Sequence, residues 1–147
     1  MTLQEILNVK GTEVFTIHES ATLDDVVQKL VTFNCGSLVV MGRRADVARD
    51  RMVGIVTERD ILRACAAGRE PLGETPVTAA MTCDVVTAGP GDSIEETMQL
   101  MTERRMRHLP IVQGEDLLGL ISIGDLVKSH HEQCVLENHY LKTYIQS

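Results

Sequence analysis

The sequence has almost no aromatic side chains and more acidic than basic ones. Its 147 residues contain two Phe, two Tyr and no Trp, so a stacking platform for single-stranded nucleic acid is not expected. Lys and Arg number 14 against 21 Asp and Glu, for a net charge of −7, which argues against nucleic acid as the primary partner. No hydrophobic run approaches the roughly 18 residues of a membrane-spanning helix, so no membrane association is expected.

Several catalytic signatures are missing as well. There is no G-x-x-x-x-G-K-S/T loop, no G-x-G-x-x-G fingerprint and no G-x-S-x-G elbow, so neither P-loop hydrolysis nor a Rossmann site is indicated. The four cysteines form no C-x-x-C pair, and Cys35 and Cys65 stand among small or apolar residues that suit buried thiols. Reduced cysteines and the lack of a readable signal peptide favour a cytoplasmic protein.

What the sequence does contain is an internal repeat. Three blocks recur in the same order, at offsets of 71, 72 and 65 residues. They are residues 22–27, 36–40 and 53–60 in the first copy, and residues 93–98, 108–112 and 118–125 in the second. The smaller last offset comes from a longer loop in the first copy, about residues 42–52. One copy alone is too small to bury both faces of a sheet, so the copies are expected to pack on each other.

Each copy is predicted to open with a short strand and a capped helix. The strands are expected near residues 14–17 and 85–86. The helix N-caps are expected at Thr22 and Ser93, and the acidic side chains three positions later complete a capping-box pattern; these are Asp25 and Glu96. Apolar residues then recur at helical spacing, and the turn at residues 34–36 is expected to end the first helix.

Short branched runs after each helix predict buried strands, and second helices are expected near Asp60 and Asp125. The fold class is therefore mixed α/β, with two βαββα repeats packed sheet to sheet and a short C-terminal helix. The expected limits are residues 10–67 for the first repeat, 68–76 for a linker, 77–130 for the second repeat and 131–147 for a helical tail.

The junction between the last strand and the last helix of each copy carries the residues suited to chemistry. Both copies place Gly, two apolar residues, a hydroxyl, two variable residues and Asp in that order, at Gly54–Asp60 and Gly119–Asp125. A hydroxyl there can donate to a phosphate beside the free N–H groups of the helix, and a carboxylate can accept from both hydroxyls of a ribose. Thr57 and Ser122 would also serve as simple helix caps. Recurrence of the glycine and the spacing favours ligand binding, because a cap requires neither.

These motifs resemble a tandem pair of cystathionine-β-synthase (CBS) domains, the Bateman module, of the stand-alone signal-transduction type. The two Gly-to-Asp motifs carry the resemblance together with the Ala80-Met81-Thr82 opening and the run from Arg105 to Val112. The resemblance covers about residues 10–130. It implies a regulatory module rather than an enzyme. Such a module binds an adenine nucleotide (AMP, ADP, ATP or NAD) in clefts between its repeats, needs no other cofactor or metal, and commonly forms a homodimer.

The resemblance also implies which residues contact the nucleotide. The hydroxyl and Asp of each motif would hold ribose and phosphate, and main-chain and apolar groups of the strands would flank the base. The set is Thr16, Ile17, Ser37, Leu38, Thr57, Arg59, Asp60, Arg107, His108, Pro110, Ser122 and Asp125. The two copies differ before their second strands, where Arg107-His108 stands against Cys35-Gly36. Because phosphate is neutralised mainly by Arg and His groups, the two clefts are expected to bind unequally.

Other functions remain open beside a nucleotide sensor that acts by population shift. A docking protein without a regulatory ligand is favoured by an apolar stripe in the tail, formed by Leu136, Tyr140, Leu141 and Tyr144. A nucleotide hydrolase would need a base, and His108 is the candidate, without an obvious orienting partner. The tail also has the spacing of a metal site at His130, His131, Cys134 and His139, although a polar helix explains it equally. Candidate dimer contacts are Leu126, Val127 and the face from Met98 to Met101, which core packing explains equally well.

Overall fold

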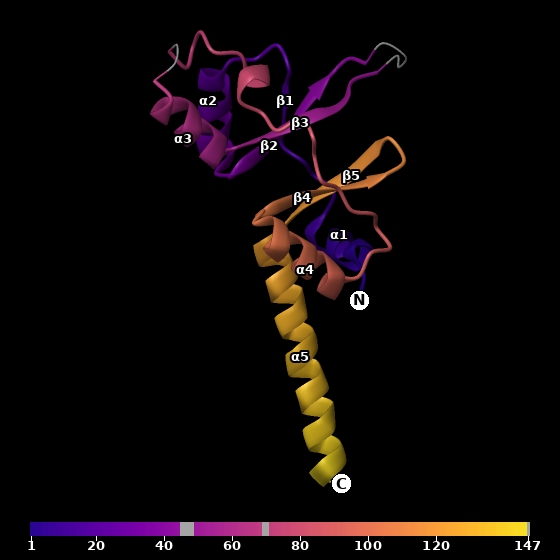
Figure 1. Cartoon of the computed structure of the whole chain (residues 1–147). Helices are drawn as coiled ribbons and strands as arrows, with labels where there is room; N and C mark the ends of the chain where they lie inside the picture. The colour runs from indigo at the N-terminus through magenta and orange to yellow at the C-terminus, as the bar shows by residue number, and fades with distance from the viewer. Residues whose placement is uncertain (45–48, 69–70, 147) are drawn as a thin grey trace. The chain divides into compact units, whose positions relative to one another are not determined.

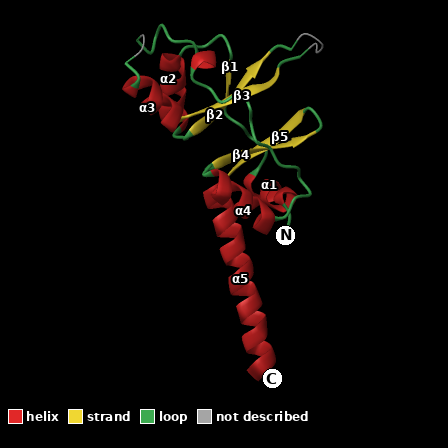
Figure 2. Cartoon of the chain, viewed as in Figure 1, coloured by secondary structure: helices red, strands yellow, loops and turns green. Residues whose placement is uncertain are grey.

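The fold consists of two small β-sheets, each in its own compact unit with its own helices (Figures 1 and 2). The computed structural model describes residues 1–44, 49–68 and 71–146. Unit 1 comprises Met1–Glu13 and Thr87–Ser147, and unit 2 comprises Val14–Val86. Parts of the expected long loop and linker, residues 45–48 and 69–70, lie outside the described residues.

Unit 2 holds a three-stranded sheet in the order β1-β2-β3. Its elements are β1 (Thr16–His18), α2 (Leu23–Phe33), β2 (Ser37–Gly42), β3 (Arg51–Thr57), α3 (Glu58–Ala66) and the 3₁₀ turn η1 (Val77–Ala79). Strand β1 runs parallel to β2, and β2 runs antiparallel to β3, with Ser37 opposite Thr57. Buried side chains of the sheet, α2 and η1 form the core of this unit, among them Val26, Leu38, Val56 and Val77.

Unit 1 holds a two-stranded antiparallel sheet of β4 and β5. Its elements are α1 (Leu3–Lys10), α4 (Ile94–Arg104), β4 (His108–Gln113), β5 (Asp116–Ser122) and α5 (Ile123–Gln146). Within the hairpin, His108 lies opposite Ser122, as Ser37 lies opposite Thr57 in unit 2. Apolar side chains of all three helices and of the sheet are buried, including Leu3, Leu7, Met101, Leu109 and Leu126.

The predicted strands of both hairpins and the predicted helix caps are confirmed. Thr22 caps α2 in a full box, because its Oγ1 accepts the Asp25 N–H at 3.3 Å and its own N–H donates to the Asp25 carboxylate at 3.0 Å. Asn34 ends this helix with a left-handed φ of 50°. At α4 only half of the box forms: Ser93 Oγ accepts the Glu96 N–H at 3.1 Å. Ser93 lies opposite Thr2 in an isolated antiparallel bridge, in which the Leu3 N–H donates to Asp92 O and the Ile94 N–H donates to Met1 O.

The strand expected near residues 85–86 does not form. Its place is taken by a single parallel bridge at Ala88, whose N–H donates to Pro110 O and whose carbonyl accepts the Val112 N–H. Pro90 follows two positions later and has no N–H with which to continue a ladder. The pairing therefore stops after one residue.

Two helices and one cysteine also differ from expectation. Helix α1 was not expected, although Thr2 and Glu5 stand at capping-box spacing and the apolar residues Leu3, Ile6 and Leu7 recur at helical intervals. The helix expected near Asp125 and the short terminal helix are one continuous element, the 24-residue α5, since neither Gly nor Pro interrupts the chain after residue 124. Cys65, expected to be buried, is exposed on α3.

The segments that precede the two repeats are exchanged between the units. Residues 1–13, which precede the recurring blocks of the first copy, belong with the blocks of the second copy in unit 1, and residues 77–86, which precede the blocks of the second copy, belong with those of the first in unit 2. Each segment passes against the glycine of the repeated motif. A Cβ on Gly54 would lie 2.8 Å from the Thr82 carbonyl oxygen, and one on Gly119 would lie 2.6 Å from a methyl of Leu7. Glycine at these positions is thus explained by the close approach of a second segment.

The predicted limits of the repeats come from the sequence pattern, whereas the two units are defined by packing. The units therefore do not test these limits, which stay predictions. Within the described ranges, the structure contains no helix with the length and hydropathy needed to cross a bilayer.

Gly54→Ala is expected to destabilise the protein by about 1–3 kcal/mol, because the added methyl group meets backbone at Thr82. Gly119→Ala should cost less, since the flexible end of Leu7 can move. Gly73→Ala is the matched control, with nothing within 4 Å of its added Cβ. Urea unfolding of the three variants measures the difference, and equal losses at Gly54 and Gly73 would contradict the explanation.

Candidate functional site

The candidate site of unit 2 is the junction at which β3 becomes α3 without an intervening loop. Thr57 is both the last residue of the strand and the N-cap of the helix. Its N–H donates to Asp60 Oδ2 at 2.9 Å, its hydroxyl lies 3.2 Å from the same oxygen, and its Oγ1 accepts the Asp60 N–H at 3.4 Å. We call Thr57 and Asp60 the Asp60 cap.

Unit 1 builds the same junction between β5 and α5. Ser122 N–H donates to Asp125 Oδ2 at 2.8 Å, and Ser122 Oγ accepts the Asp125 N–H at 3.1 Å. We call these two residues the Asp125 cap. The repeated hydroxyl and Asp therefore hold one another in both units, as the helix-cap interpretation predicts.

Each cap is tied to the start of its hairpin by one further backbone bond. The Glu58 N–H donates to Gly36 O at 3.1 Å, and the Ile123 N–H donates to Arg107 O at 2.8 Å. Gly36 is thus the counterpart of Arg107, and Ser37 is the counterpart of His108. The sequence comparison, which set Cys35-Gly36 against Arg107-His108, was wrong by one residue, because no feature of the short runs fixed their register.

The same bonds correct the expected supply of free N–H groups at these helix N-termini. The first N–H of each helix is taken by the residue before the hairpin, and the third is taken by the hydroxyl of the cap. A phosphate would therefore meet fewer backbone donors than the sequence analysis assumed. Cationic side chains must supply a larger share of any phosphate binding.

Asp60 is unusual among the capping acids in being buried. It is 8% exposed and is the one buried residue of α3, whereas Asp25 in the same kind of box is exposed. The described residues give Asp60 no ion pair with Lys, Arg or His. Its bonds from Thr57 end on Oδ2. Because an ionised carboxylate is costly to bury without donors, Asp60 retains acceptor capacity that a ligand can use.

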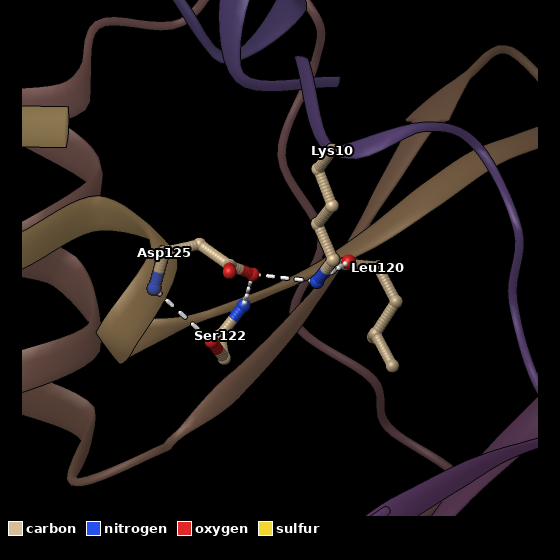
Figure 3. Close-up of polar contacts among 4 residues, drawn as sticks. All are labelled: Lys10, Leu120, Ser122 and Asp125. Carbon is tan, nitrogen blue, oxygen red and sulfur yellow. Dashed lines mark hydrogen bonds and ion pairs between the residues drawn. The ribbon is translucent and has the colours of Figure 1, made fainter. Parts of the chain in front are cut away.

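Asp125 has a different environment, shown in Figure 3. The Lys10 ammonium lies 2.5 Å from Asp125 Oδ2 and also donates to Leu120 O at 2.9 Å. Burial by itself raises the pKa of Asp125, but the Lys10 hydrogen bond, the Ser122 N–H, the Lys10 charge and the Ser122 hydroxyl together outweigh it. The net result is a pKa below the ordinary value for Asp.

The remaining predicted site residues fall into two groups, one in each unit. In unit 2, Ile17 and Leu38 belong to the apolar core, and the Thr16 carbonyl already accepts the Lys29 ammonium at 2.5 Å. Ser37 is buried and Arg59 is exposed. In unit 1, Pro110 is buried, His108 is half-buried and Arg107 is exposed. The side chains of Ile17 and Leu38 pack in the core. Only the main-chain groups of these two residues are therefore available to contact a base.

Two further expectations concern the tail and the dimer face. His130 Nε2 and Cys134 Sγ lie 3.7 Å apart on α5, but across the described ranges no three His, Cys, Asp or Glu side chains gather as a metal site would require. Of the candidate dimer contacts, Leu126 and Met101 are fully buried core residues, whereas Val127 is exposed.

Lys10 is the functional candidate that the sequence analysis missed. It precedes the repeated blocks, and no motif links it to the second repeat, which begins about 70 residues later. Only the exchange of the N-terminal segment into unit 1 brings it to Asp125.

Replacing Lys10 by Met should raise the pKa of Asp125 toward its ordinary value, as followed by NMR titration of the side-chain carboxyl. A pKa lower in the folded than in the unfolded chain gives stability that is present above the unfolded value of about 3.9 and is lost as the pH falls through the folded value. The stability difference between wild type and Lys10→Met should therefore shrink on acidification. The Lys10 side chain is 37% exposed, so that difference should be small, about 0.2–1 kcal/mol at neutral pH. An Asp125 pKa that is the same in both proteins would contradict the assignment.

Comparison with known proteins agrees with the repeated geometry. The CBS domain family matches residues 6–67 and 77–132. The CBS domain-containing protein YhcV of Bacillus subtilis is 32% identical over 125 residues, 84% of this chain and 84% of YhcV. The structure of the CBS-domain containing protein ATU1752 from Agrobacterium tumefaciens matches with a TM-score of 0.79 at 32% identity, over 88% of this chain and 99% of that chain.

A further solved structure includes a ligand. The CBS domain protein PAE2072 from Pyrobaculum aerophilum, solved as a complex with AMP, matches with a TM-score of 0.73 at 28% identity, over 85% of this chain and 89% of that chain. The family match covers most of the sequence in two consecutive segments, one for each copy of the repeat. The chain therefore belongs to the CBS domain family and carries two CBS domains in tandem.

Proposed function

We propose that this chain is a regulatory module, without catalytic activity of its own, that binds an adenosine-containing nucleotide such as AMP, ADP, ATP or NAD. The observation that carries the proposal is Asp60, a buried carboxylate held by the residue that caps its own helix and by no cation among the described residues. The AMP complex of PAE2072 supports the same ligand class.

The chemistry of the ribose explains why such a carboxylate suits the ligand. Two adjacent hydroxyls need two acceptor positions with fixed spacing, and an ionised carboxylate provides them without a donor of its own. Asp60 is held in place by Thr57, so little conformational entropy is lost when the sugar binds. The Thr57 hydroxyl can rotate from the carboxylate to a phosphate oxygen.

Phosphate and base are assigned to the remaining site residues. In unit 2 the exposed cation Arg59 can neutralise phosphate. In unit 1 the exposed cation Arg107 can do so, with His108 and Ser122 as further donors. The adenine edge is recognised by main-chain groups of each unit's own strands, around Thr16–Ile17 and Ser37–Leu38 in unit 2 and at Pro110 in unit 1, in keeping with a chain that has few aromatic side chains on which a base could stack. Binding then shifts the population of conformers toward the one that a partner protein reads.

Docking on another polypeptide is the second candidate, and α5 favours it. The C-terminal part of this helix extends away from α1 and α4 (Figure 1). Its exposed apolar side chains there are Val135, Leu136, Tyr140, Leu141, Tyr144 and Ile145. Leu126, in the first part of the helix, is buried in unit 1. Four of the exposed side chains lie on the same face of the helix as Leu126, namely Leu136, Tyr140, Leu141 and Tyr144. We propose a second copy of this chain as the occupant, because the same strip on both copies can pair with itself about a two-fold axis.

The nucleotide proposal predicts that AMP, ADP, ATP or NAD raises the melting temperature and that GMP does not. A ligand at about 100 times its Kd adds roughly 2.7 kcal/mol of stability, which corresponds to several degrees for a chain of this size. Asp60→Asn should abolish the shift.

Asp25→Asn is the matched control, because Thr22 and Asp25 form the same capping box at α2. Both variants lose part of a helix cap, and only Asp60→Asn should lose the nucleotide. The proposal is wrong if no adenine nucleotide shifts the melting temperature, or if both variants lose the shift equally.

If the chain forms this dimer, the double variant Tyr140→Ser with Leu141→Ser should have the molar mass of one chain. Light scattering after size-exclusion chromatography measures this mass. Burial of two large apolar side chains is lost in that variant. Lys142→Ser is the control, because residue 142 lies on the opposite side of the helix from Tyr140. A wild-type protein with the mass of one chain at every concentration would contradict the proposal.

A further inference from the structure

Lys10 is positioned to decide whether a ribose can use the Asp125 cap. Its ammonium contacts Asp125 Oδ2 at 2.5 Å and donates to the Leu120 carbonyl at 2.9 Å, as drawn in Figure 3. The same Oδ2 accepts the Ser122 N–H at 2.8 Å. Two donors thus converge on one carboxylate oxygen.

This arrangement competes directly with a ribose. Each carboxylate oxygen has about two acceptor positions, so the Ser122 N–H and the Lys10 ammonium fill those of Oδ2. A pair of adjacent hydroxyls that needs both oxygens would find only Oδ1 free of these two donors. The ammonium would also have to leave the Leu120 carbonyl as well as the carboxylate before the sugar could bind.

The Asp60 cap lacks this obstacle. Asp60 Oδ2 accepts from the N–H and the hydroxyl of Thr57. The hydroxyl is uncharged and can rotate away from the carboxylate, so no ion pair has to be broken before a ribose binds. In sequence, Lys10 stands three residues after Leu7, which contacts the motif glycine of unit 1. The residue three positions after Met81, which contacts the motif glycine of unit 2, is the exposed Asp84. Three residues after the side chain that contacts the motif glycine, the exchanged segment thus has the cation Lys10 in unit 1 and the acid Asp84 in unit 2.

Lys10 is also held in place by the helix that carries it. It lies in the last turn of α1, and Leu3 and Leu7 of that helix are buried in unit 1. The reach of the ammonium to Asp125 is therefore fixed by the packing of α1 and does not depend on a mobile terminus.

We propose that Lys10 is a specificity-determining residue that closes the Asp125 cap to ribose, so that the chain binds its nucleotide through Asp60 alone. This inference rests on the proposed function, since it concerns the same ligand class. It attributes the expected difference in nucleotide binding between the two CBS domains to a residue outside both repeated motifs.

Isothermal titration calorimetry with AMP tests the inference. The proteins compared are wild type, Asp60→Asn, Asp125→Asn, Lys10→Met and the double variant Lys10→Met with Asp125→Asn. Wild type should bind a single nucleotide per chain. Asp60→Asn should weaken that binding about tenfold or more, and Asp125→Asn should leave it within about twofold. Lys10→Met should gain a second site per chain, which the double variant loses.

Two controls separate the removal of the charge from a general disturbance. Lys10→Arg keeps the cation and should keep a single site, and Lys128→Met removes an exposed lysine of the same unit and should leave the stoichiometry unchanged. Melting curves without nucleotide show that each variant is folded.

The outcomes distinguish this inference from the proposed function. If wild type binds through Asp60 and Lys10→Met still binds a single nucleotide, the inference is overturned and the proposed function stands. If wild-type binding depends on Asp125 as strongly as on Asp60, the inference is overturned as well. If neither wild type nor Lys10→Met binds AMP, both fail. A site gained in Lys10→Met and lost in the double variant supports the inference where Asp60→Asn also weakens binding to the wild-type chain, and an Asp60→Asn variant that binds AMP like wild type overturns it.

Discussion

The reciprocal hydrogen bonds between an N-cap hydroxyl residue and the Asp three positions later fix both carboxylates of the candidate site. In both units the strand ends at the residue that starts the helix, so no loop intervenes. The hairpin register sets Thr57 opposite Ser37 and Ser122 opposite His108, and the first N–H of each helix is tied to the residue before the hairpin. The motif glycine admits the exchanged segment. Each carboxylate is therefore positioned by backbone geometry.

The same scaffold gives the two carboxylates different electrostatic environments. Asp60 is buried with donors from Thr57, whereas Asp125 is paired with the ammonium of Lys10. A buried anion without a cation gains most from a ligand that offers hydroxyl donors, and a paired anion gains least. Under the proposals made above, this tandem module of nearly symmetric repeats would present one ribose acceptor instead of two, and Lys10 of the exchanged N-terminal segment would decide which one.

Much of this could be predicted from the sequence because it is encoded locally. The capping boxes, the αL residue at Asn34, the four hairpin strands and the two strand-to-helix junctions all follow from short-range patterns. The predictions were wrong where tertiary contacts decide the outcome. A single bridge at Ala88 stands in place of the strand expected at residues 85–86, and Pro90 prevents the ladder from continuing beyond it. The one-residue error at Arg107 arose because hairpin register depends on cross-strand pairing. The Lys10–Asp125 contact joins residues 115 positions apart, and no local pattern predicts it.

Asp60 is proposed here as the ribose acceptor of an adenine-nucleotide module. A crystal structure of the chain grown with AMP tests it most directly, because it shows the partner of each carboxylate. Ribose hydroxyls are expected on the Asp60 carboxylate, with the Lys10 ammonium still on Asp125. A sugar bound at Asp125, with Lys10 displaced and Asp60 in contact with Thr57 alone, would contradict it.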